Sequence, residues 1–220
     1  MIMCICRKKR KINYINNRGM TLIEMIVSFA LLAIFLASAA AIIGTVSMMY
    51  FDVKGENYSR QVSDIVMEKL ESEIDGAKFE SGASVIAPKI QKEVTGSDVT
   101  GVSAGKAIIL TDKTNTKVKL YAEKGEIVVH YYPIGETYNS TDWKFDKSVY
   151  NHFTIENLYF VRGDMIGDGS VGVDVSEYGL NGVTAGTYGK DIVGIFMKMH
   201  NPRYGDYYSY RLVKMYNYTE

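Results

Sequence analysis

Glu24 is the residue whose type and position point most clearly to a chemical role in this chain of 220 residues. Residues 20–23 before it carry no charge, and residues 25–51 after it form an uncharged, mostly apolar run. A charged side chain inside a bilayer costs about 3 kcal/mol or more on insertion scales, so one that occurs there usually has a partner or a task. We therefore expect Glu24 to have a partner or a task.

The residues around Glu24 form a motif. Gly19-Met20-Thr21-Leu22-Ile23-Glu24 lies between a basic leader and the uncharged run, and this arrangement resembles the processing site of type IV prepilins and pseudopilins. The resemblance implies that a membrane-embedded prepilin peptidase cuts between Gly19 and Met20 and then methylates the new amine of Met20. It also implies that this amine pairs with Glu24 of an adjacent subunit in a filament. A buried ion pair suits the fixing of register, because a misplaced neighbour would leave a charge unpaired.

Two features depart from the family pattern. Met20 stands where phenylalanine is usual, and no proline interrupts residues 25–51, where many major pilins carry one. An ordinary secretory signal is the alternative interpretation, since Ala37-Ser38-Ala39 could serve as a small-residue cleavage site. Glu24 inside the hydrophobic region and the apolar residues beyond Ala39 argue against that alternative.

The uncharged run is long enough to span a membrane once. A helix over residues 25–51 would be ~40 Å long at ~1.5 Å per residue, whereas the hydrocarbon core is ~30 Å thick. The leader has six basic residues and no acidic one: Arg7, Lys8, Lys9, Arg10, Lys11 and Arg18. Such an excess predicts a cytoplasmic N-terminus, with the rest of the chain outside the membrane.

Removal of the leader would change the composition. The leader holds six of the 25 Lys and Arg residues and none of the 25 Asp and Glu residues, so the remainder carries 19 minus 25, or six net negative charges. Both cysteines, Cys4 and Cys6, lie in the leader. A processed chain would therefore contain no disulfide, and its outer domain would depend on packing alone.

Beyond residue 51 the pattern becomes that of an amphipathic helix. Apolar residues recur every three to five positions: Tyr58, Val62, Ile65, Leu70, Ile74 and Ala77. We predict one helix over residues 20–78, with Gly44 and Gly55 as weak points at about 1 kcal/mol each relative to alanine.

The remaining residues read as strands. They are rich in β-branched and aromatic residues over 107–111, 117–122, 126–132, 152–162, 192–200 and 207–216. Glu123-Lys124-Gly125 and residues 201–206 are the predicted hairpin turns, and residues 163–188 are a glycine-rich loop. The predicted class is α+β, a pilin-like architecture in which a long N-terminal helix packs on a mainly antiparallel sheet.

These patterns predict four parts of the chain. Residues 1–19 are a leader that is cleaved, and residues 20–51 are the transmembrane half of the helix and the filament core. Residues 52–80 are the amphipathic outer half, and residues 81–220 are a β-rich globular domain.

Other candidate sites carry less weight. His130, His152 and His200 lie in or beside predicted strands without a nucleophile or metal-ligand spacing, so we expect no enzyme and no cofactor. Asp164, Asp168 and Asp174 could supply oxygen ligands to calcium, but Ile166 occupies the third position of an EF-hand count. A solvated loop is the preferred interpretation there.

Tyrosines near the C-terminus alternate with basic residues and could stack on single-stranded nucleic acid; they are Tyr204, Tyr207, Tyr208, Tyr210, Tyr216 and Tyr218. The same pattern suits a strand with one face in the core. Because the processed chain is acidic and repels phosphate, we do not expect direct nucleic-acid binding.

Two classes of function remain. The resemblance implies a structural subunit of a type IV pilus or pseudopilus, stored in the cytoplasmic membrane and then assembled outside with other pilin subunits by the assembly machinery. The late hairpins and the large sheet domain also resemble J-type minor pseudopilins and competence pseudopilins, which favours a minor subunit. The alternative is a membrane-tethered or signal-cleaved extracellular binding domain that does not polymerise.

Overall fold

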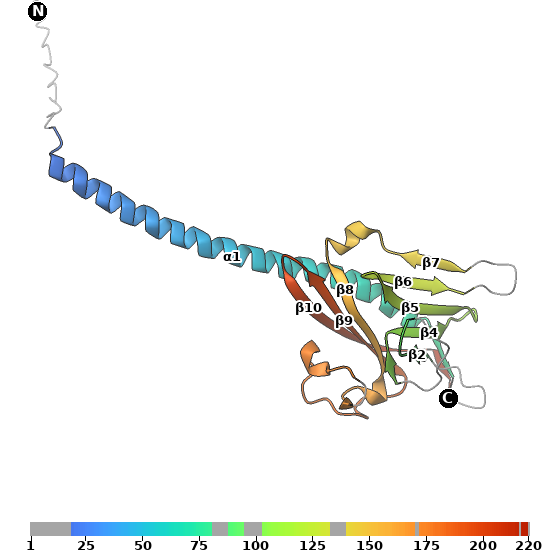
Figure 1. Ribbon diagram of the computed structural model, residues 1–220. Coiled ribbons are helices and arrows are strands. Elements are labelled where there is room, and N and C mark those ends of the chain that lie inside the picture. Colours follow the sequence, from blue (N-terminus) through green and yellow to red (C-terminus); the bar gives the residue numbers. More distant parts are fainter. Residues whose placement is uncertain are drawn as a thin grey trace, which may run out of the picture. The chain divides into compact units, whose positions relative to one another are not determined.

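The computed structural model describes residues 19–80, 88–94, 103–132, 140–169, 172–215 and 217–219. The chain forms two units, Met1–Met49 and Tyr50–Glu220. One long N-terminal helix and two antiparallel sheets make up most of the described residues (Figure 1), which confirms the predicted α+β class. Residues 1–18 of the predicted leader, with Cys4 and Cys6, lie outside the described part.

Helix α1 covers Leu22–Asp75, 54 residues, close to the predicted 20–78. It ends three residues early because Gly76 closes the last turn, donating its N–H to the Ser72 carbonyl at 3.2 Å, before the backbone enters strand β1 (Lys78–Glu80). In the first unit the large apolar side chains of α1 are exposed, Leu22 by 82% and Ile23 by 69%.

The second part of α1 packs on the sheets through one face. The buried residues are Gly55, Ser59, Val62, Ser63, Val66, Met67, Leu70 and Ile74. The prediction that Ile65 belongs to this face is wrong, because its side chain is 44% exposed. At roughly 100° per residue, Ile65 lies about 60° from Val62 on the side away from Leu70. Val66 and Met67 occupy the buried face instead.

Three sheets are present in the described residues. A four-stranded antiparallel sheet has the order β10-β9-β8-β3, a five-stranded one has the order β2-β4-β5-β6-β7, and β1 pairs with β11 in parallel. The bounds are β2 Lys89–Gln91, β3 Ala104–Gly105, β4 Ala107–Thr111, β5 Lys117–Glu123, β6 Glu126–Tyr131, β7 Thr141–Lys144, β8 Thr154–Arg162, β9 Ile192–Asn201, β10 Gly205–Lys214 and β11 Asn217–Thr219.

The longer strands agree with the predictions, and the short ones were missed. Strand β4 matches 107–111, and β5, β6, β8 and β9 differ by one or two residues at an end. Strand β10 begins two residues before the predicted 207, because Gly205 at φ +82° returns the chain to pairing directly opposite Asn201. Strands β1, β2, β3, β7 and β11 have only two to four residues, too few to show an alternating pattern.

The predicted turn between β5 and β6 is confirmed. Glu123 pairs with Glu126, so Lys124 and Gly125 form a two-residue loop. Both have positive φ, 52° and 81°, as a type I′ turn requires. This turn suits the right-handed twist of the two strands and fixes their register.

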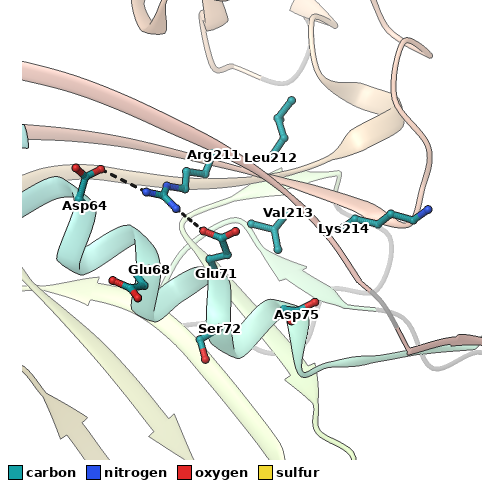
Figure 2. A pocket seen from close by; sticks show the side chains of 9 residues that line it. All are labelled: Asp64, Glu68, Glu71, Ser72, Asp75, Arg211, Leu212, Val213 and Lys214. Atoms are coloured by element: carbon teal, nitrogen blue, oxygen red, sulfur yellow. Dashed lines mark hydrogen bonds and ion pairs between the residues drawn. The ribbon is translucent and has the colours of Figure 1, made fainter.

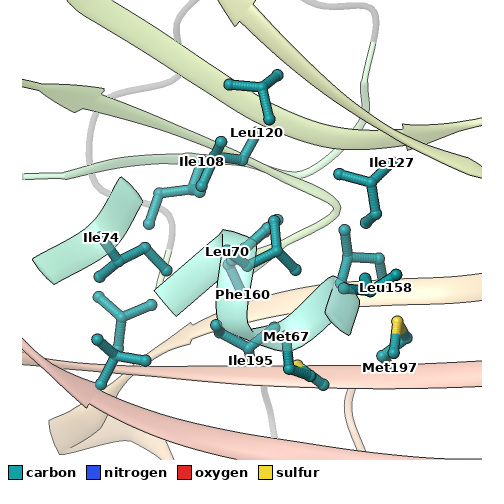
Figure 3. Close-up of a cluster of buried hydrophobic side chains, with 14 of the residues drawn as sticks. Met67, Leu70, Ile74, Ile108, Leu120, Ile127, Leu158, Phe160, Ile195 and Met197 are labelled. Carbon is teal, nitrogen blue, oxygen red and sulfur yellow. The ribbon is translucent and has the colours of Figure 1, made fainter. Parts of the chain in front are cut away.

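The main core lies between α1 and the two antiparallel sheets (Figure 3). Met67, Leu70 and Ile74 of α1 meet side chains from both sheets, among them Leu120 and Ile195. A second cluster on the other face of the four-stranded sheet joins Ile166, Tyr178 and Phe196. The prediction of a solvated loop around Asp164, Asp168 and Asp174 is therefore wrong in part, since Ile166 is fully buried. The loop supplies the apolar cover for that face.

Candidate processing and assembly site

The Gly19–Met20 bond lies in irregular backbone just before α1. Met20 is 64% exposed, and a Cβ placed on Gly19 would have no atom within 4 Å. Exposed backbone outside regular structure is where proteolysis concentrates. The bond is therefore accessible in the isolated chain.

Glu24 is hydrogen-bonded at the start of α1. The Thr21 backbone N–H donates to Glu24 Oε2 at 2.8 Å, and the Thr21 hydroxyl donates to the same oxygen at 3.0 Å. In return the Glu24 backbone N–H donates to Thr21 Oγ1 at 3.3 Å. This reciprocal pair is a capping box, which satisfies two of the N–H groups that a helix leaves free at its N-terminus. This cap is not among the features predicted from the sequence, although the Thr-x-x-Glu spacing indicates it.

The surface around Glu24 is apolar. Leu22, Ile23, Met25 and Ile26 are 46–82% exposed, and the exposed apolar side chains continue along the helix to Val53. In the described residues one helix, α1, is long and apolar enough to cross a membrane. A contiguous apolar surface of this extent marks a membrane or partner contact.

Two of the candidate calcium ligands bond to neighbouring residues, and the three do not lie together. Arg162 Nη2 donates to Asp164 Oδ2 at 3.0 Å, and Asp174 accepts from the Ser176 N–H at 3.0 Å. Asp168 lies in the turn after the short helix η2 (Gly163–Met165). Among the described residues, these three aspartates do not form a cluster of possible metal ligands.

A different group of described residues forms a cluster of possible metal ligands. It comprises Glu156, His200 and Asp206, whose potential ligand atoms lie within 4.8 Å of one another. The Lys198 ammonium lies among them, 2.7 Å from Glu156 Oε2 and 2.8 Å from Asp206 Oδ2. Its hydrogen bonds to Asp206 and Glu156 raise the pKa of Lys198, and those from Lys198 and His200 lower the pKa of Asp206. The lysine thus supplies the cation that these carboxylates need.

The histidines occupy separate places. His130 pairs with Asp142 across β6 and β7, His200 pairs with Asp206 at 2.6 Å, and His152 lies at φ 67° in the turn before β8. Among the described residues, no serine, threonine or cysteine side chain is hydrogen-bonded to these imidazoles. The two His–Asp pairs are therefore cross-strand contacts.

A groove of about 590 Å³ lies between α1 and β10 (Figure 2). Arg211 of β10 reaches two carboxylates of α1 from one wall, contacting Glu71 through Nη1 and Asp64 through Nη2 at 3.3 Å. Glu68, Asp75 and Lys214 also line the groove. The ion pairs of Arg211 therefore link α1 to β10, the edge strand of the four-stranded sheet.

The C-terminal tyrosines are divided between two faces of β10. Tyr207 packs against the main core, whereas Tyr208 packs against the second cluster, with its ring 5.5 Å from that of Tyr178. Tyr210 is 39% exposed and stacks on Phe196. The side chains of Tyr216 and Tyr218 lie outside the description. The described tyrosines therefore do not form one continuous stacking surface.

Comparison with known proteins identifies the N-terminal motif. Residues 15–40 match the family model described as the prokaryotic N-terminal methylation motif. No curated protein shows significant similarity to the chain. The match includes Gly19, Met20 and Glu24 and supports the resemblance to type IV pilin-like precursors.

Proposed function

We propose that this protein is a structural subunit of a type IV pilus or pseudopilus. The observation that carries the proposal is the methylation motif at residues 15–40, which includes the start of a helix with exposed apolar side chains, and this helix continues into a folded β domain. A helix with that surface needs lipid or other helices around it. A filament subunit is surrounded by lipid while it is in the membrane and by the helices of other subunits once it is in the filament.

Processing would take place at the cytoplasmic face of the membrane. The six basic residues of the leader hold the N-terminus inside, and residues 20–51 span the bilayer. The prepilin peptidase cuts between Gly19 and Met20 and methylates Met20. The domain outside would then be free of the leader's positive charge.

Glu24 would have two successive partners. In the single chain its carboxylate accepts hydrogen bonds from Thr21, which lowers the cost of keeping it in apolar surroundings. In the filament the methylated amine of Met20 from a neighbouring subunit would supply the opposite charge. This exchange makes correct register favourable, because a displaced neighbour leaves both charges unpaired.

The subunit is proposed to be a minor one. A processed chain of 201 residues (220 minus 19) has a large outer domain. The J-type and competence-type resemblance points the same way. The partners would be other pilin subunits and the assembly machinery, and the final location would be an extracellular pilus or pseudopilus.

Mass spectrometry of the protein from its native cells tests the processing. The expected result is a chain that begins at methylated Met20. A chain that begins near Ala40, or one that keeps Cys4, would contradict it.

Substitution of Glu24 tests the assembly. We expect Glu24→Ala to be exported and cleaved but to be lost from sheared filaments, with Glu24→Gln showing the same defect because it lacks the charge. Glu68→Ala is the matched control, since Glu68 is an exposed carboxylate on the same helix. If Glu24→Ala enters filaments as well as Glu68→Ala, the tethered-domain alternative is favoured.

A further inference from the structure

Aromatic and basic side chains gather where α1 enters the second unit. We call this group the collar, and it comprises Tyr50, Phe51, Lys54 and Tyr58 of α1 with Arg203 and Tyr204 of the β9–β10 turn. All six residues belong to the second unit. Phe51 is also the last residue of the uncharged run.

Both cations of the collar lie against aromatic rings. Lys54 Nζ is 5.8 Å from the ring centre of Tyr50 and 5.5 Å from that of Tyr58. Arg203 Cζ is 4.4 Å from the ring centre of Phe51 and 5.6 Å from that of Tyr204. Stacking uses the faces of the guanidinium and leaves its N–H groups at the edge available for other acceptors.

The turn that carries Arg203 is fixed by Asn201. The buried Asn201 side chain accepts the backbone N–H groups of Arg203 at 2.9 Å and of Tyr204 at 3.3 Å. Tyr204 then seats against Gly55 and stacks on Phe153, at 6.3 Å and 18°. Arg203 is therefore presented by a built turn rather than by a loose loop.

The cations of the collar lack carboxylate partners. In the described part of the chain neither Lys54 nor Arg203 takes part in an ion pair, whereas the nearby Arg60 is paired with Glu56 at 2.7 Å. The hydrogen bond to Tyr58 raises the pKa of Lys54, so this side chain is charged at neutral pH. Asp52 is an exposed carboxylate two residues before Lys54. The two cations thus lie against aromatic side chains that are open to the surroundings, since Tyr50 is 59% exposed and Phe51 is 41% exposed.

We propose that the collar docks on the phospholipid headgroup layer of the membrane that α1 spans. Lys54 follows Phe51, the last residue of the uncharged run, by three positions, or about 4.5 Å along the helix. With Phe51 at the outer edge of the hydrocarbon core, this distance puts the ammonium at the level of the lipid phosphates. Aromatic rings concentrate at this interface, and each basic residue near an anionic surface strengthens binding. The inference rests on the proposed membrane stage of the function. Docking would hold the domain at the bilayer until assembly withdraws the helix.

The test uses the full chain in nanodiscs of phosphatidylethanolamine and phosphatidylglycerol that include a lipid with a nitroxide on its headgroup. Cys4→Ser and Cys6→Ser remove the native thiols, and Pro202→Cys carries a fluorescent label beside Arg203. A second protein carries the label at Ala185→Cys, in the exposed loop over the other face of the four-stranded sheet. We expect strong nitroxide quenching at position 202 and weak quenching at 185.

Charge removal then tests the cause. Loss of two cations near an anionic surface lowers the equilibrium constant for docking by roughly 30-fold. In the Lys54→Gln/Arg203→Gln variant, the label at position 202 should therefore be quenched no more than the reference label at position 185. Lys113→Gln/Lys117→Gln removes the same charge from two exposed residues, one in the β4–β5 turn and one at the start of β5, and should leave the quenching unchanged. An unchanged melting temperature of each variant shows that the fold is kept.

Equal quenching at positions 202 and 185 would overturn the proposal, and so would quenching at 202 that survives the Lys54→Gln/Arg203→Gln change. Alkaline extraction of cell membranes separates this failure from that of the proposed function. If the chain resists extraction but the label at position 202 is not quenched, only the docking proposal fails. If the chain is extracted, the membrane stage of the proposed function fails.

Discussion

Tyr204 occupies the space that a side chain at position 55 would need. A Cβ on Gly55 would lie 2.5 Å from Cδ1 of Tyr204 and 2.7 Å from its Cγ, closer than real Cβ contacts allow. Gly55 was predicted to be a weak point of the helix because glycine lacks a side chain. The structure gives the glycine a packing role, since it allows the β9–β10 turn to close on α1.

We predict that Gly55→Ala destabilises the outer domain. Alanine gains about 1 kcal/mol in helix propensity, but overpacking costs about 1–3 kcal/mol, so the free energy of unfolding should fall. The sign should reverse in a Tyr204→Ala background, where the clash is absent, and a double-mutant cycle measures this coupling. Gly44→Ala is the control, because a Cβ there meets nothing within 4 Å. A Gly55→Ala protein as stable as its parent would contradict the prediction.

Tyr150 holds the start of β6 by a buried hydrogen bond. Its hydroxyl accepts the Ile127 backbone N–H at 2.8 Å, and both residues are buried. Tyr150→Phe leaves that N–H without its partner, which should lower the free energy of unfolding by about 1–3 kcal/mol. Denaturant unfolding followed by the single tryptophan, Trp143, would measure the change. Tyr210→Phe, at a 39% exposed tyrosine, should change it by less than about 0.5 kcal/mol.

The capping box at the start of α1 can be tested without a filament. Thr21→Ala removes the hydroxyl that accepts the Glu24 N–H and should cost about 1 kcal/mol of helix stability. Amide exchange of residues 22–25 in micelles should become several-fold faster. Thr45→Ala is the matched control, since the Thr45 hydroxyl only donates to the Ala41 carbonyl within the helix. Equal exchange in the two variants would show that the box does not hold the helix start.

Tyr178 predicts how stability changes at alkaline pH. Burial in the second cluster, followed by the nearby Glu177 charge, raises the pKa of Tyr178 to about 12 from its ordinary 10.0. The unfolded chain would ionise this phenol near pH 10 while the folded chain keeps it neutral. The stabilisation is therefore complete below pH 10 and is lost as the pH rises through 12. Unfolding curves at rising pH should show this loss in the parent chain, and Tyr178→Phe should lack that part of it.

The sequence alone determined the features that depend on neighbouring residues. An uncharged run followed by an amphipathic pattern predicts a helix close to Leu22–Asp75. Lys124-Gly125 and the turn from Pro202 to Gly205 determine two hairpins, because the glycines at 125 and 205 adopt positive φ readily. The motif from Gly19 to Glu24 is likewise local. These features follow from backbone conformation and from side-chain periodicity.

Only the tertiary structure decided which of those residues meet. The register shifts between Ile155 and Asn157 of β8, which leaves Glu156 without a paired residue and close to Lys198. Arg203 lies over Phe51, about 150 residues earlier in the chain, because Asn201 and Gly205 shape its turn and Gly55 admits Tyr204. Long-range packing selects such contacts from many that the local pattern allows, so the sequence indicated the motif, the elements and most of the buried face of α1, but not the collar.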